Sequence, residues 1–244
     1  MRVAAVIPAR NEERGLALVL DALPRHLVTE VVVVDNGSTD GTAAAARAAG
    51  ATLLREPRPG YGAACLRALD YLAPKHPDVV VFLDGDFSDH PEELPRLLEP
   101  IRADACDLVI GSRVLGRREP GALLPQARAG NWVATLLLRL LYGGRFTDLG
   151  PFRAVRFDAL RRLQMRDRGY GWTVEMQARA LLLGLRVAEV PVSYRRRVGR
   201  SKISGTIEGS VRAGGRILWT IVATRFRDGG RLRRSAADPG GGSA

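Results

Sequence analysis

The first half of the sequence alternates short apolar runs with segments whose apolar residues recur at helical spacing. Apolar runs of strand length occupy residues 3–8, 30–34, 51–54, 79–83 and 108–110. Segments of helical spacing lie between them, at residues 13–23, 41–50, 60–72 and 91–99. Apolar strands joined by helices are typical of a parallel sheet that helices cover on both faces. The sequence therefore predicts an α/β fold with a mostly parallel central sheet.

Polar residues follow these runs, and ligands of open parallel sheets bind where the carboxyl ends of the strands meet. Asp84, Gly85 and Asp86 come directly after the run 79–83. Two carboxylates separated by a glycine can hold a divalent cation that bridges a diphosphate. The alternative is a capped loop before the helix at residue 91. The place of the pair at a strand end favours the metal site.

Two further turns have the composition of a nucleotide site. Asp35 can accept hydrogen bonds from a ribose or a base, and Gly37 lets backbone N–H groups approach a ligand. Gly62 belongs to the segment RPGYG, which opens a helix whose N-terminus favours an anion. The alternative for the first turn is an Asx-capped link between strand and helix. The chain lacks GxGxxG, which argues against a dinucleotide fingerprint.

The second half has helical spacing at residues 126–141, 173–183 and 206–226, with a strand expected at 186–192. Asp148 and Glu175 can each act as a base or accept a hydrogen bond from a substrate hydroxyl. Both can instead form ion pairs with the many arginines.

A basic loop with the sequence RRRVGRSK occupies residues 195–202. Of the 37 Lys and Arg residues only Lys75 and Lys202 are lysines. A lysine inside this cluster indicates a site that suits an ammonium group better than a guanidinium. The alternative is a solvated basic loop.

The positive charge of the chain is unevenly placed. The net charge is +11, and residues 186–234 hold 13 basic against three acidic residues. Such a zone indicates an anionic partner: phosphate groups, a membrane surface or nucleic acid. No apolar stretch approaches the ~18–20 residues that span a bilayer. Two distant cysteines without CxxC argue against a disulfide framework and a zinc site.

The motifs occur in an order that resembles a known family. Along the chain they read VIPARNEE, VVVVDNGSTDGT, GYG, FLDGDFSDHPEEL, IGSR, TDLGPFRAV and RRVGRSK. Together they resemble the family 2 inverting glycosyltransferases, and within them the polyprenyl-phosphate group that includes the dolichol-phosphate mannose synthases. The resemblance implies a GT-A fold, which is Rossmann-like, and Mg²⁺ or Mn²⁺ as cofactor.

The resemblance also implies roles for individual positions. The residues expected to line the nucleotide pocket are Pro8, Arg10, Glu12 and Asp35. The expected metal pair is Asp84 and Asp86. Asp148 and Arg153 match a loop near the transferred sugar and the acceptor phosphate, and Glu175 remains a catalytic candidate. The loop expected to close over phosphates contains Arg196, Gly199, Ser201 and Lys202. We also expect the nucleotide sugar to lie beside Gly37, Gly62 and Gly85, because glycine lets the backbone approach a ligand closely.

Two positions depart from the family pattern. Related enzymes often have Asp-Asp-Gly-Ser where this chain has Asn36 as the second residue, so one carboxylate is missing. Dolichol-phosphate mannose synthases commonly have a Gln metal ligand where this chain has Ser88. Asp89 or water can substitute for that ligand.

We expect a GT-A domain at residues 1–205, a basic amphipathic extension at 206–234 and a disordered tail at 235–244. The expected reaction is metal-dependent, inverting transfer of a hexose from a UDP- or GDP-sugar to a polyprenyl phosphate. A phosphate is largely anionic at pH 7, so it needs no strong base. The alternative is transfer to a hydroxyl of a soluble or glycolipid acceptor, which needs one.

The location expected for such an enzyme is cytoplasmic, peripheral on the inner face of the membrane. The helix at 206–226 is expected either to bind an anionic membrane or to pack on the domain. A nucleotidyltransferase is disfavoured because no glycine-rich run ending in Lys or Arg follows the first strand. No nucleic-acid partner is expected, and the sequence leaves a homo-oligomer open.

Overall fold

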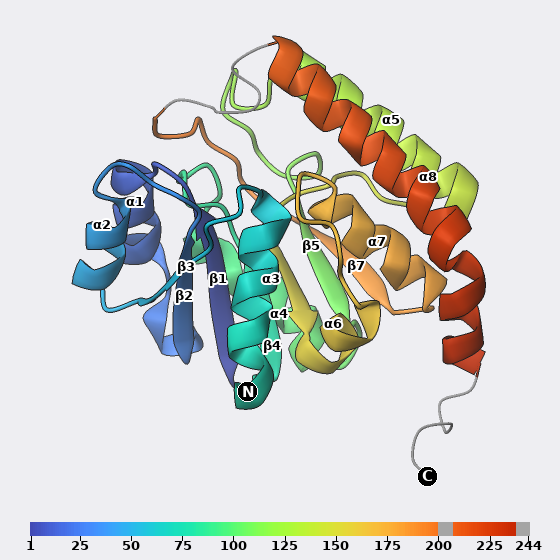
Figure 1. Cartoon of the computed structure of the whole chain (residues 1–244), viewed down its shortest axis with the longest axis horizontal. Helices are drawn as coiled ribbons and strands as arrows, with labels where there is room; N and C mark the ends of the chain where they lie inside the picture. Colours follow the sequence, from blue (N-terminus) through green and yellow to red (C-terminus); the bar gives the residue numbers. More distant parts are fainter. Residues whose placement is uncertain (200–206, 238–244) are drawn as a thin grey trace.

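The computed structural model describes residues 1–199 and 207–237, with the side chains of the last helix described from residue 213 to 228. A seven-stranded sheet with the order β3-β2-β1-β4-β6-β5-β7 forms its centre (Figure 1). The strands are β1 (Val3–Ala9), β2 (Glu30–Asp35), β3 (Thr52–Arg55), β4 (Val79–Phe82), β5 (Leu108–Ser112), β6 (Arg153–Arg156) and β7 (Val187–Pro191). The expected mostly parallel α/β sheet is thereby confirmed.

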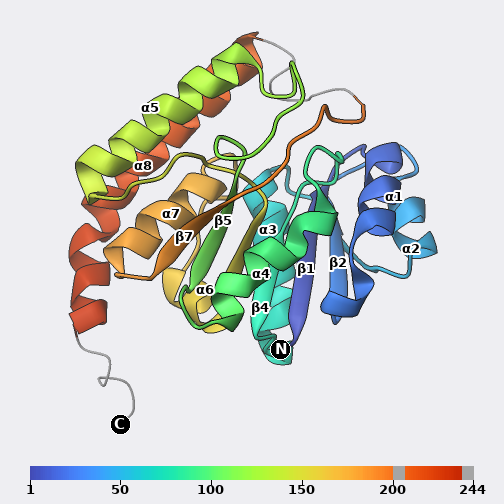
Figure 2. The ribbon, with the colours of Figure 1, turned by 180° about the vertical axis from the view of Figure 1, so that it is seen from behind.

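Helices cover both faces of the sheet. They are α1 (Glu13–Ala22), α2 (Thr42–Ala48), α3 (Tyr61–Leu72), α4 (Leu94–Arg102), α5 (Pro125–Tyr142), α6 (Phe157–Leu163), α7 (Trp172–Leu182) and α8 (Ile207–Ala237). Short 3-10 turns are η1 (Arg25–Leu27), η2 (Ala73–Lys75) and η3 (Pro91–Glu93). Helices α1, α2 and α4 pack on one face, and α3, α6 and α7 on the other (Figures 1 and 2).

Alternation along each buried strand divides the core between these two faces. In β1, Ala5 and Ile7 join the cluster of α1 and α4, whereas Ala4 and Val6 join the cluster of α3 and α7. This follows from the two-residue period of a strand. Because both faces are covered, the strand has no polar alternation, which is why its sequence is a plain apolar run.

The short strand β6 was not predicted from the sequence, and it begins where the loop before it ends. It runs antiparallel between β4 and β5, with Arg153 opposite both Phe82 and Ile110. Four residues with arginine at both ends carry no periodic apolar signal. Because β6 is antiparallel, its first residue lies at the carboxyl ends of its neighbours. The loop 147–152 is therefore delivered to the edge of the sheet where ligands bind.

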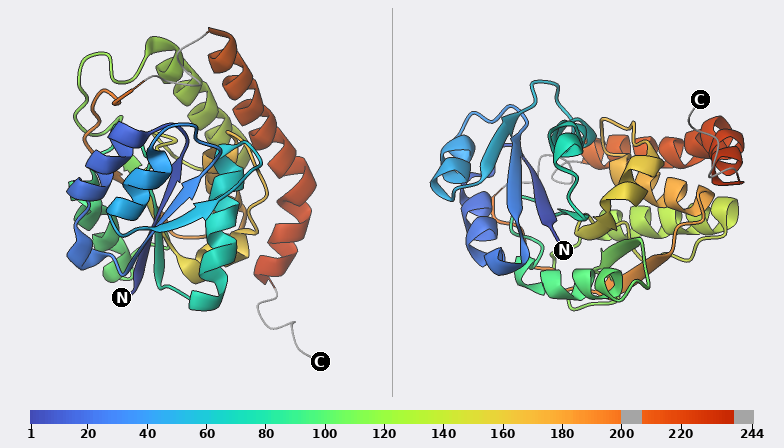
Figure 3. Two further views of the ribbon diagram at one scale, coloured as in Figure 1. Left: turned by 60° about the vertical axis from the view of Figure 1, so that its left-hand side comes forward. Right: turned by 90° about the horizontal axis from the view of Figure 1, so that it is seen from below.

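Helices α5 and α8 form an outer layer beside α7 (Figures 1 and 3). Ile221 of α8 is fully buried in a cluster with Ala134, Leu138 and Val174. The helix expected at residues 206–226 is longer than predicted and takes in residues 235–237, which were expected to be disordered. Residues 238–244 lie outside the described residues. No helix in the described residues has the length and apolar character to cross a bilayer.

A buried ionic cluster joins α8 to α7. Arg179 donates to Glu175 over 2.9 Å and to Asp228 over 2.6 Å. All three side chains are buried, so the carboxylates and the guanidinium depend on one another for polar partners. The position of α8 is thus fixed by charge pairs as well as by apolar packing.

We predict that Asp228→Ala lowers the free energy of unfolding by about 1.5–3 kcal/mol, because a hydrogen bond to a charged partner is lost. Urea denaturation measures the change. The matched control is Arg227→Ala on the exposed side of the same helix. Equal stability of the two variants would contradict the role of Asp228 in holding α8.

Candidate active site at the carboxyl edge of the sheet

A polar pocket of about 170 Å³ lies at the carboxyl ends of β1, β2 and β4. Of the predicted residues, those lining it are Pro8, Arg10, Glu12, Asp84, Gly85 and Asp86. Other lining residues include Asn36, Gly60, Tyr61, Tyr170 and Arg197, which were not predicted as site residues. The strand-end rule therefore brought together segments that lie more than 70 residues apart in the chain.

The carboxylates of Asp84 and Asp86 both face this pocket. Burial raises the pKa of Asp84 well above its usual range, and the charges of Asp86 and Asp89 raise it further. Asp86 accepts hydrogen bonds from the backbone N–H of Ser88 over 2.9 Å and from its hydroxyl over 2.5 Å. The hydroxyl at position 88 is thus engaged in orienting Asp86.

Asp89 lies behind the pair and is 1% exposed. Its Oδ2 atom accepts from the N–H of Asp84 over 3.3 Å, while its buried Oδ1 atom has no hydrogen-bond partner among the described residues. Burial, followed by the charge of Asp86, raises the pKa of Asp89 to about 7. Neither Asp89 nor Ser88 lines the polar pocket.

Arg197 bridges the two acidic sides of the pocket. Its guanidinium contacts Asp86 at 3.3 Å and Glu12 at 2.6 Å. The motif had indicated Arg196 instead, but the side chain of Arg196 donates to the carbonyl of Pro120 over 2.7 Å, away from the pocket. Adjacent residues of an extended segment point in opposite directions. The other predicted phosphate ligands, Ser201 and Lys202, lie outside the described residues.

Asn36 explains one departure from the family pattern. Its amide nitrogen donates to the carbonyls of Glu56 over 2.8 Å and Arg58 over 2.7 Å, and its Oδ1 accepts from Gly60 over 2.8 Å. Because an ionised carboxylate cannot donate, an Asp here would leave both carbonyls without this partner. Asn36 therefore ties the end of β2 to the turn before α3.

Asp35 and Gly37 shape the same turn from outside the pocket. Asp35 is buried, and its Oδ1 accepts from the N–H of Ser38 over 2.8 Å. Gly37 has φ +79°, a left-handed conformation that glycine adopts without strain. Neither is among the lining residues. The structure thus shows the Asx-turn alternative at this position, and a contact with a nucleotide stays a prediction.

Gly62 serves a close approach between two backbones. A Cβ at this position would lie 2.0 Å from the carbonyl oxygen of Asp167. Gly62 itself does not line the polar pocket, whereas Gly60 does. The segment 167–169 is therefore brought against the start of α3, which places Tyr170 over the pocket.

Asp148 is fully buried in an ion pair with Arg113. The two carboxylate oxygens accept from the backbone N–H, Nε and Nη2 of Arg113 at 2.7–2.8 Å, and from the N–H of Leu149. Burial opposes the charge of Arg113, yet the Asp148 carboxylate prevails and raises the pKa of the guanidinium. Both carboxylate oxygens of Asp148 are occupied by these hydrogen bonds, so the geometry does not support its expected role as a base.

Arg153 and Glu175 do not line the polar pocket either. Arg153 donates to the carbonyls of Leu149, Gly150 and Thr173. Burial lowers the pKa of Arg153 to about 10. Glu175 accepts from two backbone N–H groups and from Arg179. Their contacts hold the loop before β6 and the helix α7 in place, and the catalytic roles expected for them are not supported.

A second, apolar pocket of about 390 Å³ lies between α5 and α8. Its inner end is formed by Tyr61, Asp84, Arg113 and Tyr170, three of which also line the polar pocket. The Tyr61 hydroxyl is buried and has no hydrogen-bond partner in the described residues. Burial, aided by the charge of Asp84, raises the pKa of Tyr61 well above its usual range.

Arg113 is a further site residue that was not among the predicted ones. Two of its side-chain nitrogens are used by Asp148, and its guanidinium carbon lies 5.0 Å from the ring centroid of Tyr194. Its position directly after β5 was the only available signal, because its partner lies 35 residues later in the chain.

Residues 4–164 match the family model described as glycosyl transferase family 2. The chain belongs to this family. It is 39% identical to an undecaprenyl-phosphate mannosyltransferase of Micrococcus luteus over 86% of this chain and 90% of the relative. It is 32% identical to a polyprenol monophosphomannose synthase of Mycolicibacterium smegmatis, over 84% of this chain and 82% of the relative.

A solved structure gives the same fold. Glucosyl-3-phosphoglycerate synthase from Mycobacterium tuberculosis, in complex with Mn²⁺, UDP and glucosyl-3-phosphoglycerate, superposes with a TM-score of 0.73 at 26% identity. The superposition covers 92% of this chain and 79% of that chain. The chain is thus a glycosyltransferase with the GT-A fold, as the motifs predicted.

We predict that Asn36→Asp lowers the free energy of unfolding by about 2–4 kcal/mol, because two carbonyls lose their donor and face a carboxylate instead. Thermal denaturation measures it. Ser38→Ala is the control in the same turn, since it removes one acceptor, which bonds the N–H of Asn11. An Asn36→Asp variant as stable as the wild type would contradict the bridging role.

Proposed function

We propose that the chain transfers a hexose, with inversion, from a nucleotide-diphospho-sugar to a polyprenyl phosphate. The observation that carries the proposal is the junction of the two pockets. The polar pocket and the apolar pocket share Tyr61, Asp84 and Tyr170, so a polar donor and an apolar acceptor would meet beside Asp84. The names of the two bacterial relatives favour mannose as the sugar.

Arg113 is the group that suits the acceptor phosphate. Asp148 fixes one side of its guanidinium and Tyr194 lies against it, while Nη1 has no partner among the described contacts. A guanidinium held in this way is a preorganised phosphate ligand. We infer that it orients the phosphate of the lipid at the inner end of the apolar pocket.

In the proposed reaction an oxygen of the acceptor phosphate attacks the anomeric carbon of the sugar. The new carbon–oxygen bond forms as the bond to the nucleoside diphosphate breaks, and the electron pair leaves with the diphosphate. Because the phosphate is already anionic, no base has to remove a proton. The buried, fully paired states of Asp148 and Glu175 agree with this chemistry.

The residues of the polar pocket fit a divalent cation. Asp84 and Asp86 present carboxylate oxygens as ligands. Burial and then the charges of Asp86 and Asp89 raise the pKa of Asp84, and a cation between the carboxylates would offset that crowding of negative charge. The described residues contain no group of three or more His, Cys, Asp or Glu arranged for a metal. Water and diphosphate oxygens would complete the coordination, as is common for Mg²⁺. A bound Mg²⁺ or Mn²⁺ would stabilise the charge that develops on the leaving diphosphate.

The proposal includes GDP and UDP as alternatives for the donor nucleotide, and binding measurements with GDP-sugars and UDP-sugars distinguish them. UDP-sugars are included because the solved neighbour contains Mn²⁺ and UDP. A lipid acceptor also requires the enzyme to work at a membrane. We propose peripheral attachment on the cytoplasmic face, where nucleotide-sugars are present.

The metal proposal predicts that Asp86→Asn reduces transfer by about 100-fold or more, since the cation supplies several kcal/mol of charge stabilisation. EDTA should abolish the activity of the wild type, and Mn²⁺ or Mg²⁺ should restore it. The control is Asp70→Asn, the same change at an exposed position of α3. Full activity of the wild type in EDTA would refute the metal site.

The acceptor proposal predicts that Gly214→Leu reduces transfer to undecaprenyl phosphate by about tenfold or more, because the side chain fills the apolar pocket. A Cβ at Gly214 or at its neighbour Gly215 meets no atom within 4 Å, so the first atom of either side chain has open space. Gly215 does not line the pocket and is the matched control.

The assay follows radiolabelled sugar from GDP-mannose or UDP-glucose into a lipid product. Nucleotide binding should be the same in both variants, because the pocket occupied by the added side chain is the apolar one. Sugar transfer by the wild type to hydroxyl acceptors, with none to polyprenyl phosphates, would overturn the proposed function. Equal loss in Gly214→Leu and Gly215→Leu would reject the path between α5 and α8.

A further inference from the structure

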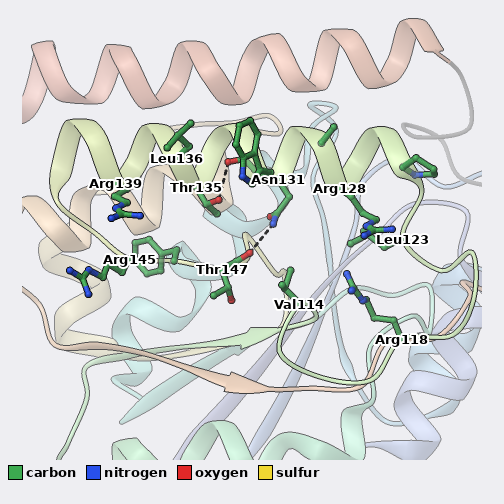
Figure 4. A pocket seen from close by; sticks show the side chains of 14 residues that line it. Val114, Arg118, Leu123, Arg128, Asn131, Thr135, Leu136, Arg139, Arg145 and Thr147 are labelled. Carbon is green, nitrogen blue, oxygen red and sulfur yellow. Dashed lines mark hydrogen bonds between the residues drawn. The ribbon is translucent and has the colours of Figure 1, made fainter.

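A basic pocket of about 740 Å³ lies on α5; it shares no residue with the polar pocket and shares only Leu123 and Asn131 with the apolar pocket. It is formed by α5, the segment after β5 and residues 145–147 (Figure 4). Its basic residues are Arg118, Arg128, Arg139 and Arg145, which Figure 4 shows as two groups at its ends. All four are exposed, and none is paired with an acidic side chain of the described residues.

Apolar side chains occupy the space between these arginines. The pocket is lined by Val114, Leu123, Trp132, Leu136 and Phe146. Trp132 is 65% exposed and Leu140, on the same helix, is 70% exposed. The sequence of α5 contains no acidic residue. A surface that combines unpaired arginines with exposed aromatic and aliphatic groups is typical of helices that lie in a membrane interface.

Two arginines of α8, in the segment that the sequence analysis considered for membrane binding, make contacts within the protein. Arg216 donates to Asp167 over 2.8 Å, and Arg225 donates to the carbonyl of Leu141 over 3.0 Å. The carboxylate of Asp167 offsets the charge of Arg216, whereas the neutral carbonyl of Leu141 only orients Arg225. The pocket on α5 brings together four arginines without an acidic partner among the described residues, from a stretch (residues 113–147) that holds six arginines and one acidic residue.

We propose that this basic pocket is a docking site for the head groups of anionic phospholipids in a bilayer. The arginines match the phosphate in charge and geometry, and Trp132 and Leu140 match the acyl region beneath the head groups. A free phosphate would gain nothing from the exposed apolar residues, so a lipid surface accounts for both parts of the pocket. The inference does not depend on a lipid acceptor and goes beyond the proposed reaction.

The experiment is co-sedimentation of the full chain with phosphatidylglycerol–phosphatidylcholine vesicles and with phosphatidylcholine vesicles alone. The test variant carries Arg128→Gln and Arg139→Gln. Each arginine near an anionic bilayer contributes about fivefold to partitioning, so the pair should lose about 25-fold. The matched control carries Arg161→Gln and Arg162→Gln, the same charge change at exposed positions of α6. Trp132→Ala tests the apolar part and should also weaken binding.

The expected result is salt-sensitive binding of the wild type and the control to the anionic vesicles, with loss in the α5 variants and unchanged nucleotide binding in all. If the wild type does not bind the anionic vesicles at low salt, the proposal is overturned. An equal loss in the α6 control would overturn it too, since the net charge of +11 would then be responsible. Inorganic phosphate that binds the pocket without any vesicle binding would identify a free-phosphate site instead. Transfer to a lipid acceptor in detergent tests the proposed function separately.

Discussion

The buried ion pair between Asp148 and Arg113 depends on the one strand that runs against the others. Because β6 is antiparallel, the loop before it arrives at the carboxyl end of β5, where Arg113 begins the next segment. Burying two charges is favourable only when every polar atom finds a partner. Asp148 accepts four hydrogen bonds at no exposure, which fixes Arg113 at the junction of the two pockets.

That geometry explains how a carboxylate in the motif TDLGPFRAV can matter without acting as a base. Removing Asp148 would leave the guanidinium of Arg113 without its carboxylate partner, and the junction of the two pockets would lose its fixed cation. Asn36 has the corresponding role beside the polar pocket, where its amide connects β2 to the turn before α3. In both places a polar side chain positions the wall of a pocket through hydrogen bonds to neighbouring loops.

The sequence predicted the parallel strands, the helices between them and the acidic pair at Asp84 and Asp86, because these follow from apolar runs and from the polar residues at their ends. It did not predict β6, whose four residues begin and end with arginine. The motif indicated Arg196, whereas the structure places Arg197 in the pocket. The direction of a side chain in an irregular segment depends on its tertiary contacts. The sequence did not predict that Asp148 and Glu175 are buried and paired, because their partners lie far away in the chain or one helical turn away.

Charge gives the clearest contrast between linear and spatial reasoning. Most of the surplus positive charge lies in the last fifth of the chain, yet Arg197 and Arg216 there are paired with Glu12 and Asp167 from earlier segments. A guanidinium that pairs with a carboxylate contributes little to the external field, whereas an unpaired one contributes its full charge. The arginines of the basic pocket come from outside that last fifth and have no acidic partner among the described residues. The surface proposed to bind anions therefore depends on which arginines lack an acidic partner after folding, a property that the density of arginine along the chain does not determine.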